Sequence, residues 1–155
     1  MATWAFAYTP VSIPPSAPFP AGLIVHRPYL IARVVAASSG QSVNCFVWLD
    51  SGADQCVFPL SFTGPLGFDP LNMKMDLTGG VGASANITYY ETITVEIPIT
   101  NGPTLSFKTL AGFTAGMEAQ GIGLLGQRGF FETFQVGFNY AVKTFITKSD
   151  RPVHT

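Results

Sequence analysis

The stretch CFVWLDSGADQCVFP, Cys45 to Pro59, places two carboxylates, Asp50 and Asp54, between two strongly apolar runs. An ionised carboxylate that is removed from water is costly unless it is paired or hydrogen-bonded. Carboxylates in such a setting therefore either hold the local structure together or take part in chemistry. The triplet Asp50-Ser51-Gly52 is also a common turn sequence, so taken alone it leaves a structural role for Asp50 open.

Around this stretch the sequence has the pattern of short β-strands. Two apolar runs, YLIARVVA (29–36) and SVNCFVWLD (42–50), are separated by the turn signal ASSGQ and predict a β-hairpin that leads into Asp50. In TITVEIPI (92–99) apolar and other residues alternate, which is the period of a half-buried strand. Helical spacing of phenylalanines occurs in GQRGFFETFQ (126–135). With 16 glycines and 12 prolines, these runs predict an all-β domain, a barrel or a sandwich, with one short helix.

Length and composition bound the class of protein. A chain of 155 residues suits one domain. Residues 8–20, YTPVSIPPSAPFP, hold five of the twelve prolines and are expected to form an extended arm or linker before the fold proper. Because 47% of the residues are hydrophobic and only 11% are charged, we expect some apolar surface to be covered in an oligomer interface or a groove.

Charge and hydropathy argue against two kinds of partner. The net charge is −1 and the basic residues are scattered, so no field suited to nucleic acid is expected. No apolar run reaches the roughly 18 residues needed to cross a bilayer, and the start of the sequence lacks a secretory signal pattern. A soluble, cytoplasmic protein is the resulting expectation.

Cysteine and histidine usage gives little support for metal or thiol chemistry. Cys45 and Cys56 are too few for a disulfide scaffold and are expected to be buried thiols. The only histidines, His26 and His154, lie far in sequence from the other polar clusters, so neither a zinc site nor a Cys-His nucleophile is indicated. No metal and no cofactor are expected.

Three short motifs follow one another along the chain: DSGA at the end of a strand, a glycine-rich stretch MDLTGGVGAS, and IGLLGQRGFF near the end. Their key positions are Asp50, Ser51, Gly52 and Ala53; Gly79, Gly80, Val81 and Gly82; and Leu124, Leu125 and Gly126. In this order and approximate spacing they resemble the retropepsins, the retroviral-type aspartic proteases. The resemblance covers residues 27–147.

The resemblance implies a closed acid-protease barrel with a flap hairpin over residues 77–88 and one short C-terminal helix, assembled as a homodimer. It would divide the chain into a proline-rich arm (1–26), a protease domain (27–147) and a C-terminal tail (148–155). The loop SFTGPLGFDPLN (61–72) is an addition that is more like the cellular and bacterial members.

The resemblance also assigns roles to individual residues. Catalysis would rest on Asp50, Ser51 and Gly52. Substrate binding would involve Ala53, Asp54, Gly79, Gly80, Val81, Gly82 and Leu125, with structural support from Leu124, Gly126 and Arg128. Two facing carboxylates share one proton, because like charges about 3 Å apart cannot both ionise, so each chain of the dimer would contribute one Asp50. The implied substrate is a polypeptide in extended conformation.

Two departures from the family pattern concern the supporting residues. The glycine-rich stretch reads GGVGAS and lacks a second glycine pair, which predicts a stiffer tip. After Leu-Leu-Gly the family usually has Arg followed by Asp or Asn, whereas this chain has Gln127 and Arg128. We expect Arg128 to reach Asp54 as a charge-assisted pair, so that Arg128→Ala is more damaging than Gln127→Ala.

Three other interpretations remain open. Ser51 could be a nucleophile, but no G-x-S-x-G elbow surrounds it and only His26 is available as a base within the fold. The chain could be a catalytically silent, dimeric peptide-binding or assembly module. It could also be a purely structural barrel in which Asp50 caps a turn. The complete DSGA motif favours the enzyme, because a pure binder has no need for the acid.

Overall fold

The computed structural model describes residues 2–79 and 85–149, and these are built mainly of β-strands joined by short loops. The strands are β1 (Ala2–Ala7), β2 (Thr9–Ile13), β3 (Leu23–Arg27), β4 (Tyr29–Ala36), β5 (Ser42–Leu49), β6 (Val57–Pro59), β7 (Lys74–Gly79), β8 (Ala85–Pro98), β9 (Thr104–Thr114), β10 (Gly123–Leu125), β11 (Gln135–Asn139) and β12 (Thr144–Ser149). Short helical turns are η1 (Leu60–Phe62), η2 (Pro70–Asn72), η3 (Ala115–Met117) and η4 (Gln127–Phe131). The predicted all-β class is confirmed.

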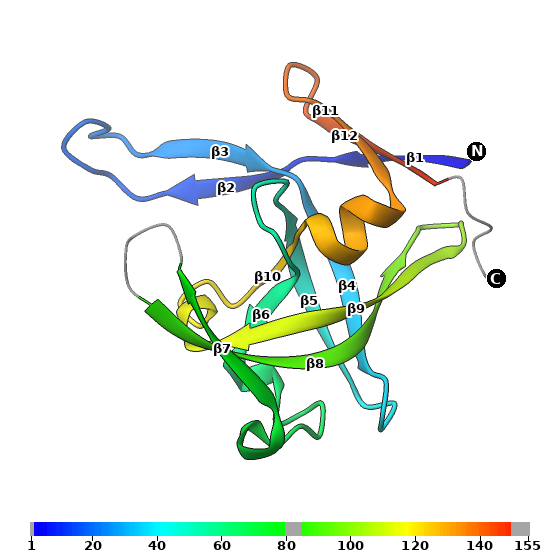
Figure 1. Ribbon diagram of the computed structural model, residues 1–155. Helices are drawn as coiled ribbons and strands as arrows, with labels where there is room; N and C mark the ends of the chain where they lie inside the picture. Colours follow the sequence, from blue (N-terminus) through cyan, green and yellow to red (C-terminus); the bar gives the residue numbers. More distant parts are fainter. Residues whose placement is uncertain (1, 80–84, 150–155) are drawn as a thin grey trace.

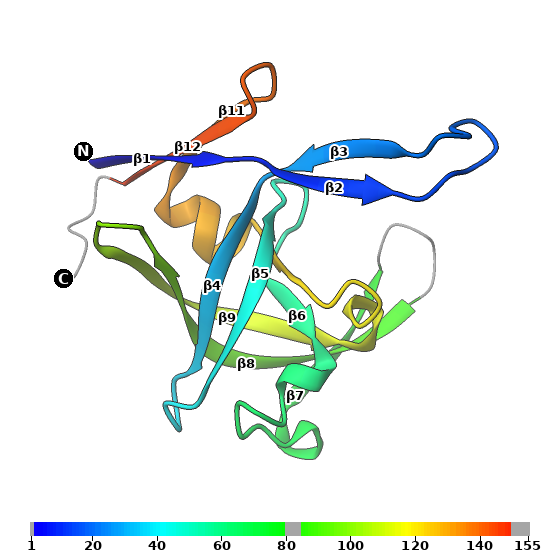
Figure 2. The ribbon, with the colours of Figure 1, turned by 180° about the vertical axis from the view of Figure 1, so that it is seen from behind.

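The main sheet closes on itself. Its strand order is β4-β5-β10-β6-β9-β8-β7, and β4 also pairs with β8, so that six strands form a barrel and β7 continues beyond the closure along β8 (Figures 1 and 2). Closure satisfies the backbone groups that an open sheet would leave at its edges. The closed barrel expected from the resemblance is confirmed, and the sandwich is excluded.

The hairpin that leads into Asp50 forms as predicted. Strands β4 and β5 pair antiparallel from Tyr29↔Trp48 to Val35↔Ser42. Gly40, at φ +74°, supplies the left-handed conformation that the turn between the strands requires. Every second residue of β4 is buried in the barrel, so the alternation in the sequence fixes which face points inward.

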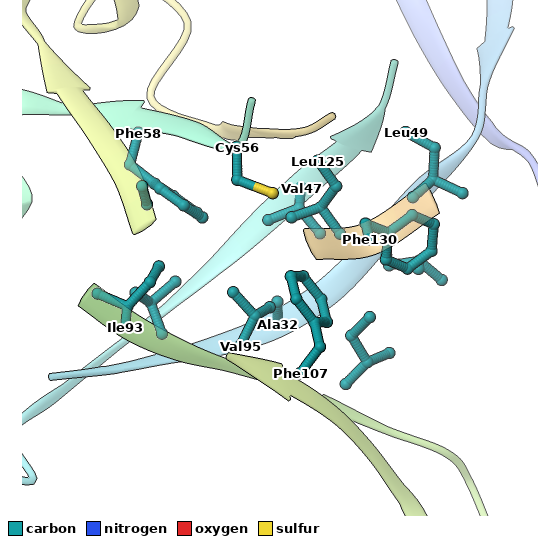
Figure 3. Close-up of a cluster of buried hydrophobic side chains, with 14 of the residues drawn as sticks. Ala32, Val47, Leu49, Cys56, Phe58, Ile93, Val95, Phe107, Leu125 and Phe130 are labelled. Atoms are coloured by element: carbon teal, nitrogen blue, oxygen red, sulfur yellow. The ribbon is translucent and has the colours of Figure 1, made fainter. Parts of the chain in front are cut away.

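The core fills the interior of the barrel with side chains from opposite walls (Figure 3). The alternation predicted for 92–99 is confirmed, because Ile93, Val95 and Ile97 are fully buried. Across the interior lie side chains of β5, β6, β9 and β10, among them Phe58 and Leu125, both of which are also fully buried. Burial of these apolar side chains is the main source of stability for such a barrel.

The expected short helix lies at η4 and runs on through Glu132 and Thr133. It begins later than the sequence pattern suggests, because Arg128 has an extended backbone and Gly129 has φ +92°. Phe130 and Phe134 are buried on one face of the turn, with ring centroids 5.1 Å apart, and Phe131 packs beside them half-buried. The phenylalanine spacing thus predicted the helix correctly, and the conformation of Gly129 moves the start of the helix to a later residue.

The residues before the barrel are themselves strands. β1 pairs antiparallel with β12, and β12 with β11, in a separate sheet of three strands. β2 and β3, from the proline-rich region, form a two-stranded hairpin that projects away from the barrel (Figures 1 and 2). The β1–β12 pairing therefore joins the two ends of the described chain, across the boundaries that the sequence suggested at residues 26 and 147.

Phe58→Ala tests the inside-outside assignment of the barrel. Phe58 is fully buried, so its removal leaves a cavity and should lower the free energy of unfolding by about 3–5 kcal/mol. Phe46 is 50% exposed, and Phe46→Ala should have a much smaller effect. Urea denaturation of both variants measures the difference, and equal losses would contradict the described packing.

Candidate active site

Asp50 lies directly after β5, at the point where two neighbouring strands end together. β5 and β10 pair in parallel, with Leu49 opposite Leu125, and the backbone N–H of Asp50 donates to the carbonyl oxygen of Leu125 over 3.0 Å. The side chain is half-buried. A carboxylate therefore lies at the end of a barrel strand, in a position that is partly buried.

A tight turn fixes the Asp50 side chain. Its Oδ1 accepts the N–H of Gly52 at 2.9 Å, and its carbonyl oxygen accepts the N–H of Ala53 at 3.1 Å. A Cβ atom at position 52 would lie only 3.2 Å from that Oδ1. A carboxylate has about four sites for hydrogen-bond donors, so the Gly52 contact leaves capacity for a water molecule or a substrate.

The segment that follows β10 braces this turn. The N–H of Gln127 donates to the carbonyl oxygen of Ala53 at 2.8 Å, and the N–H of Arg128 donates to that of Asp54 at 3.0 Å. The side-chain amide of Gln127 donates to the carbonyl oxygen of Ser51 at 3.0 Å. These contacts join the DSGA and LLG motifs, which lie far apart in the sequence.

Gly126 permits this close approach. A Cβ atom at this position would lie 2.6 Å from the carbonyl oxygen of Ala53 and closer still to that of Gln55. The glycine of the LLG motif is therefore required by its contact with the loop after Asp50. Its neighbour Leu125 is fully buried in the core, and Leu124 is half-buried opposite Trp48 and Val57.

The other residues predicted for the site lie on a second hairpin. β7 and β8 pair as far as Gly79 and Ala85, and Gly79 is exposed. The hydroxyls of Thr78 and Thr88 hydrogen-bond to each other across the hairpin at 2.6 Å. Residues 80–82, Gly80, Val81 and Gly82, lie outside the described residues. The ends of β7 and β8 project from the barrel on the same side as β2 and β3 (Figures 1 and 2).

The expected pair between Asp54 and Arg128 is not formed. Both residues are exposed, and among the residues whose side chains the structure describes, Arg33 with Glu96 is the one ion pair. Arg128 supports the loop through its backbone N–H, while the side-chain bracing comes from Gln127. The bracing role of Gln127 was not predicted from the sequence, because a charged partner for Asp54 was expected at this point, whereas a neutral amide satisfies a backbone carbonyl equally well.

The thiols and His26 are poorly placed for nucleophilic catalysis. Burial raises the pKa of Cys45 to about 12 and that of Cys56 to about 11, so both remain protonated near neutral pH. The ring of His26 faces that of Tyr140, and no hydrogen bond in the described part of the chain joins it to Ser51. No cluster of three or more metal-ligating side chains occurs among the described residues.

Comparisons with known proteins give a likeness in structure and none in sequence. No protein-family model matches the chain, and no curated protein matches it. Among solved structures, the chain is similar to a retropepsin-like aspartic protease from Rickettsia conorii, with 20% identity and a TM-score of 0.47, over 94% of this chain and 92% of that one. Within the described residues no helix is long and apolar enough to span a membrane.

Gly126→Ala tests the contact between the two motifs. The added methyl group would meet backbone oxygens that cannot move independently, so we expect a loss of about 1–3 kcal/mol in the free energy of unfolding. Gly64→Ala is the matched control, since a Cβ atom there meets nothing within 4 Å. Thermal melts that show the same loss for both variants would rule out the proposed close approach.

A second pair of variants compares the two residues after the LLG motif. Gln127→Ala removes the hydrogen bond to Ser51 and should lower stability by about 0.5–1.5 kcal/mol. Arg128→Ala keeps the backbone contact and should change stability by less than about 0.5 kcal/mol. This ranking reverses the one expected from the sequence. Chemical denaturation decides between the two rankings. A larger loss of stability for Arg128→Ala would support the ion pair between Arg128 and Asp54.

Proposed function

We propose that the protein is an aspartic endopeptidase of the retropepsin type, which hydrolyses peptide bonds with a water molecule held between the Asp50 carboxylates of two identical chains. The observation that carries the proposal is the setting of Asp50. It is half-buried at a strand end, and its side chain accepts the N–H of Gly52. The loop that follows it is held by hydrogen bonds from the segment after β10. A carboxylate that is held in this way is preorganised for acid-base chemistry.

The second carboxylate has to come from another copy of the chain. Asp54 is exposed, Asp69 caps η2 by accepting the N–H of Leu71, and Asp76 accepts the N–H of Leu77 on the β7–β8 hairpin. None of these follows a barrel strand as Asp50 does. A two-fold axis between two Asp50 residues supplies a symmetric pair, since the same surface of each copy then meets itself.

Each step of the proposed reaction balances in protons. One Asp50 carboxylate removes a proton from water while the water oxygen bonds to the carbonyl carbon, and the protonated partner gives its proton to the carbonyl oxygen. In the tetrahedral intermediate the first Asp50, now protonated, gives its proton to the nitrogen, while one hydroxyl of the gem-diol returns a proton to the second Asp50. The C–N bond then breaks, and a carboxylic acid and an amine leave. The pair ends with one shared proton, as it began.

The remaining predicted residues would hold the peptide. We assign to the β7–β8 hairpin, together with the predicted residues Gly79, at the end of β7, and Gly80, Val81 and Gly82, which follow it in the sequence, the closing movement over an extended polypeptide, which would bind by strand-like backbone hydrogen bonds. Ala53 and Asp54 would form the floor, and Ser51 would join the two loops across the axis. Leu125, which the sequence also assigned to substrate binding, is fully buried and would support this floor from the core. The low content of charged residues, 11%, is in keeping with apolar pockets and a covered interface.

An alternative function is a dimeric module that binds peptides without cleaving them. The contact of Asp50 Oδ1 with the N–H of Gly52 fits any function without catalysis, because a turn cap alone explains that contact. The two functions differ in whether the second carboxylate oxygen takes part in chemistry, and one isosteric substitution separates them.

Asp50→Asn is that substitution. The asparagine oxygen can still accept the N–H of Gly52, so the fold should persist, while cleavage should fall by a factor of about 10²–10⁴ or more. Digestion of a peptide library, read by mass spectrometry, measures cleavage, and melting curves check the fold. Asp69→Asn is the control, because it keeps its helix cap outside the site. Undiminished cleavage by the Asp50→Asn protein would refute the mechanism.

Mixing the same variant with the wild type tests the shared site. If activity needs both acids, an equal mixture that has exchanged subunits should show about half the activity per wild-type chain, because half of the chains then sit in mixed dimers. Activity per wild-type chain that stays constant would show that one chain is sufficient.

A further inference from the structure

A cavity of about 430 Å³ opens beside the loop that carries Asp50. Its walls come from that loop, from the β7–β8 hairpin, from β9 and from the helical turn η4. The lining residues are Gln55, Lys74, Asp76, Tyr90, Thr109, Leu110, Arg128 and Glu132. The cavity has no role in the proposed catalytic step, although four of its lining residues are acidic or basic.

The two carboxylates of the cavity already have backbone partners. Asp76 Oδ1 accepts the N–H of Leu77 at 2.8 Å, and Glu132 Oε2 accepts the N–H of Gly129 at 3.0 Å. The two cations differ from them: within the described residues, neither Lys74 nor Arg128 has a carboxylate within ion-pair distance. The cavity therefore holds equal numbers of cationic and anionic side chains, and its two cations, unlike its two carboxylates, have no hydrogen-bond or ion-pair partner among the described residues.

Neutral donors add to this character. Burial raises the pKa of Tyr90, and the nearby Asp76 raises it further, so its hydroxyl keeps its proton near neutral pH and can donate. The hydroxyl of Thr109 also lines the cavity. A group that accepts several hydrogen bonds can use all four of these donors, whereas a basic group would find only the two carboxylates, each of which already accepts one backbone N–H.

The cavity lies next to residues assigned to the substrate site. Gln55 follows Asp54, and the carbonyl oxygen of Asp54 accepts the N–H of Arg128. Lys74 and Asp76 lie on β7, which forms one strand of the β7–β8 hairpin. An extended peptide that passes Asp50 beneath this hairpin would thus carry one of its outer side chains toward the cavity.

We propose that this cavity binds an acidic side chain of the substrate and so gives the enzyme a preference for Glu or Asp at one position outside the scissile pair. The proposal rests on the proposed function. Arg128 would contribute most, because its planar guanidinium can bind a carboxylate through two parallel hydrogen bonds, and Lys74 would add a point charge. The side chain of Arg128 then selects the substrate, whereas its backbone N–H supports the carbonyl oxygen of Asp54.

The test uses a set of octapeptides with two central apolar residues and one variable position, scanned along the peptide and filled with Glu, Gln or Lys. For the wild type we expect one position at which kcat/KM with Glu exceeds that with Gln by about tenfold, and at which Lys is the poorest. Equal rates for the three residues at every position, or a preference for Lys, would overturn the proposal.

Variants link the preference to the cavity. Arg128→Gln and Lys74→Gln should each reduce the ratio of Glu to Gln, and the double variant should bring it to about one. Lys108→Gln, an exposed lysine of β9 outside the cavity, should leave the ratio unchanged. A ratio that survives the double variant would place the selectivity elsewhere. Because the ratio compares two peptides on one protein, a loss of folded protein does not alter it.

Binding without cleavage separates this proposal from the function on which it rests. The Asp50→Asn protein is titrated into fluorescein-labelled Glu, Gln and Lys octapeptides, and fluorescence anisotropy gives their affinities. Tighter binding of the Glu peptide with no cleavage by the wild type would support the cavity and reject the protease. Cleavage by the wild type, with equal affinities of the variant for the three peptides, would support the protease and reject the cavity.

Discussion

The insertion of β10 between β5 and β6 is the constraint on which the rest of the structure depends. This short strand pairs in parallel with β5 and antiparallel with β6, and without it the barrel would not close. It also brings Leu125 against the N–H of Asp50 and Gly126 against the loop beyond. Barrel closure and the position of the carboxylate are thus set by the same few backbone contacts, so a change that weakens one should weaken the other.

Much of the barrel could be predicted because its signals are local. The β4–β5 hairpin, the alternation in 92–99 and the phenylalanine face at 130–134 each appear within a few residues, and the structure confirms them. Closure and the pairing of β1 with β12 connect segments that are distant in sequence, and no local pattern reports them. The prolines of residues 8–20 concealed β2 and β3, since proline weakens a strand prediction even where a two-stranded hairpin tolerates it.

The candidate site could be predicted only in part. The position of Asp50 follows from a strand that ends in DSGA, and the need for Gly126 follows from its motif. The bracing amide of Gln127 could not be separated from the guanidinium of Arg128, because the choice depends on which side chain turns toward Ser51. The charged cavity was not foreseen at all, since its walls come from four separate elements and charge becomes a property of the site only after folding.

The sheet formed by β1, β12 and β11 has a consequence for how the chain acquires its structure. β1 precedes all the barrel strands in the sequence and its partner β12 follows them, so during synthesis β1 stays unpaired with β12 until every barrel strand has been made. Bringing such distant segments together carries a loop-closure entropy that local hairpins avoid, and contacts of this kind slow folding. The β4–β5 and β8–β9 hairpins can form early, whereas the sheet of β1, β12 and β11 is a late, non-local step that requires β1 to find β12.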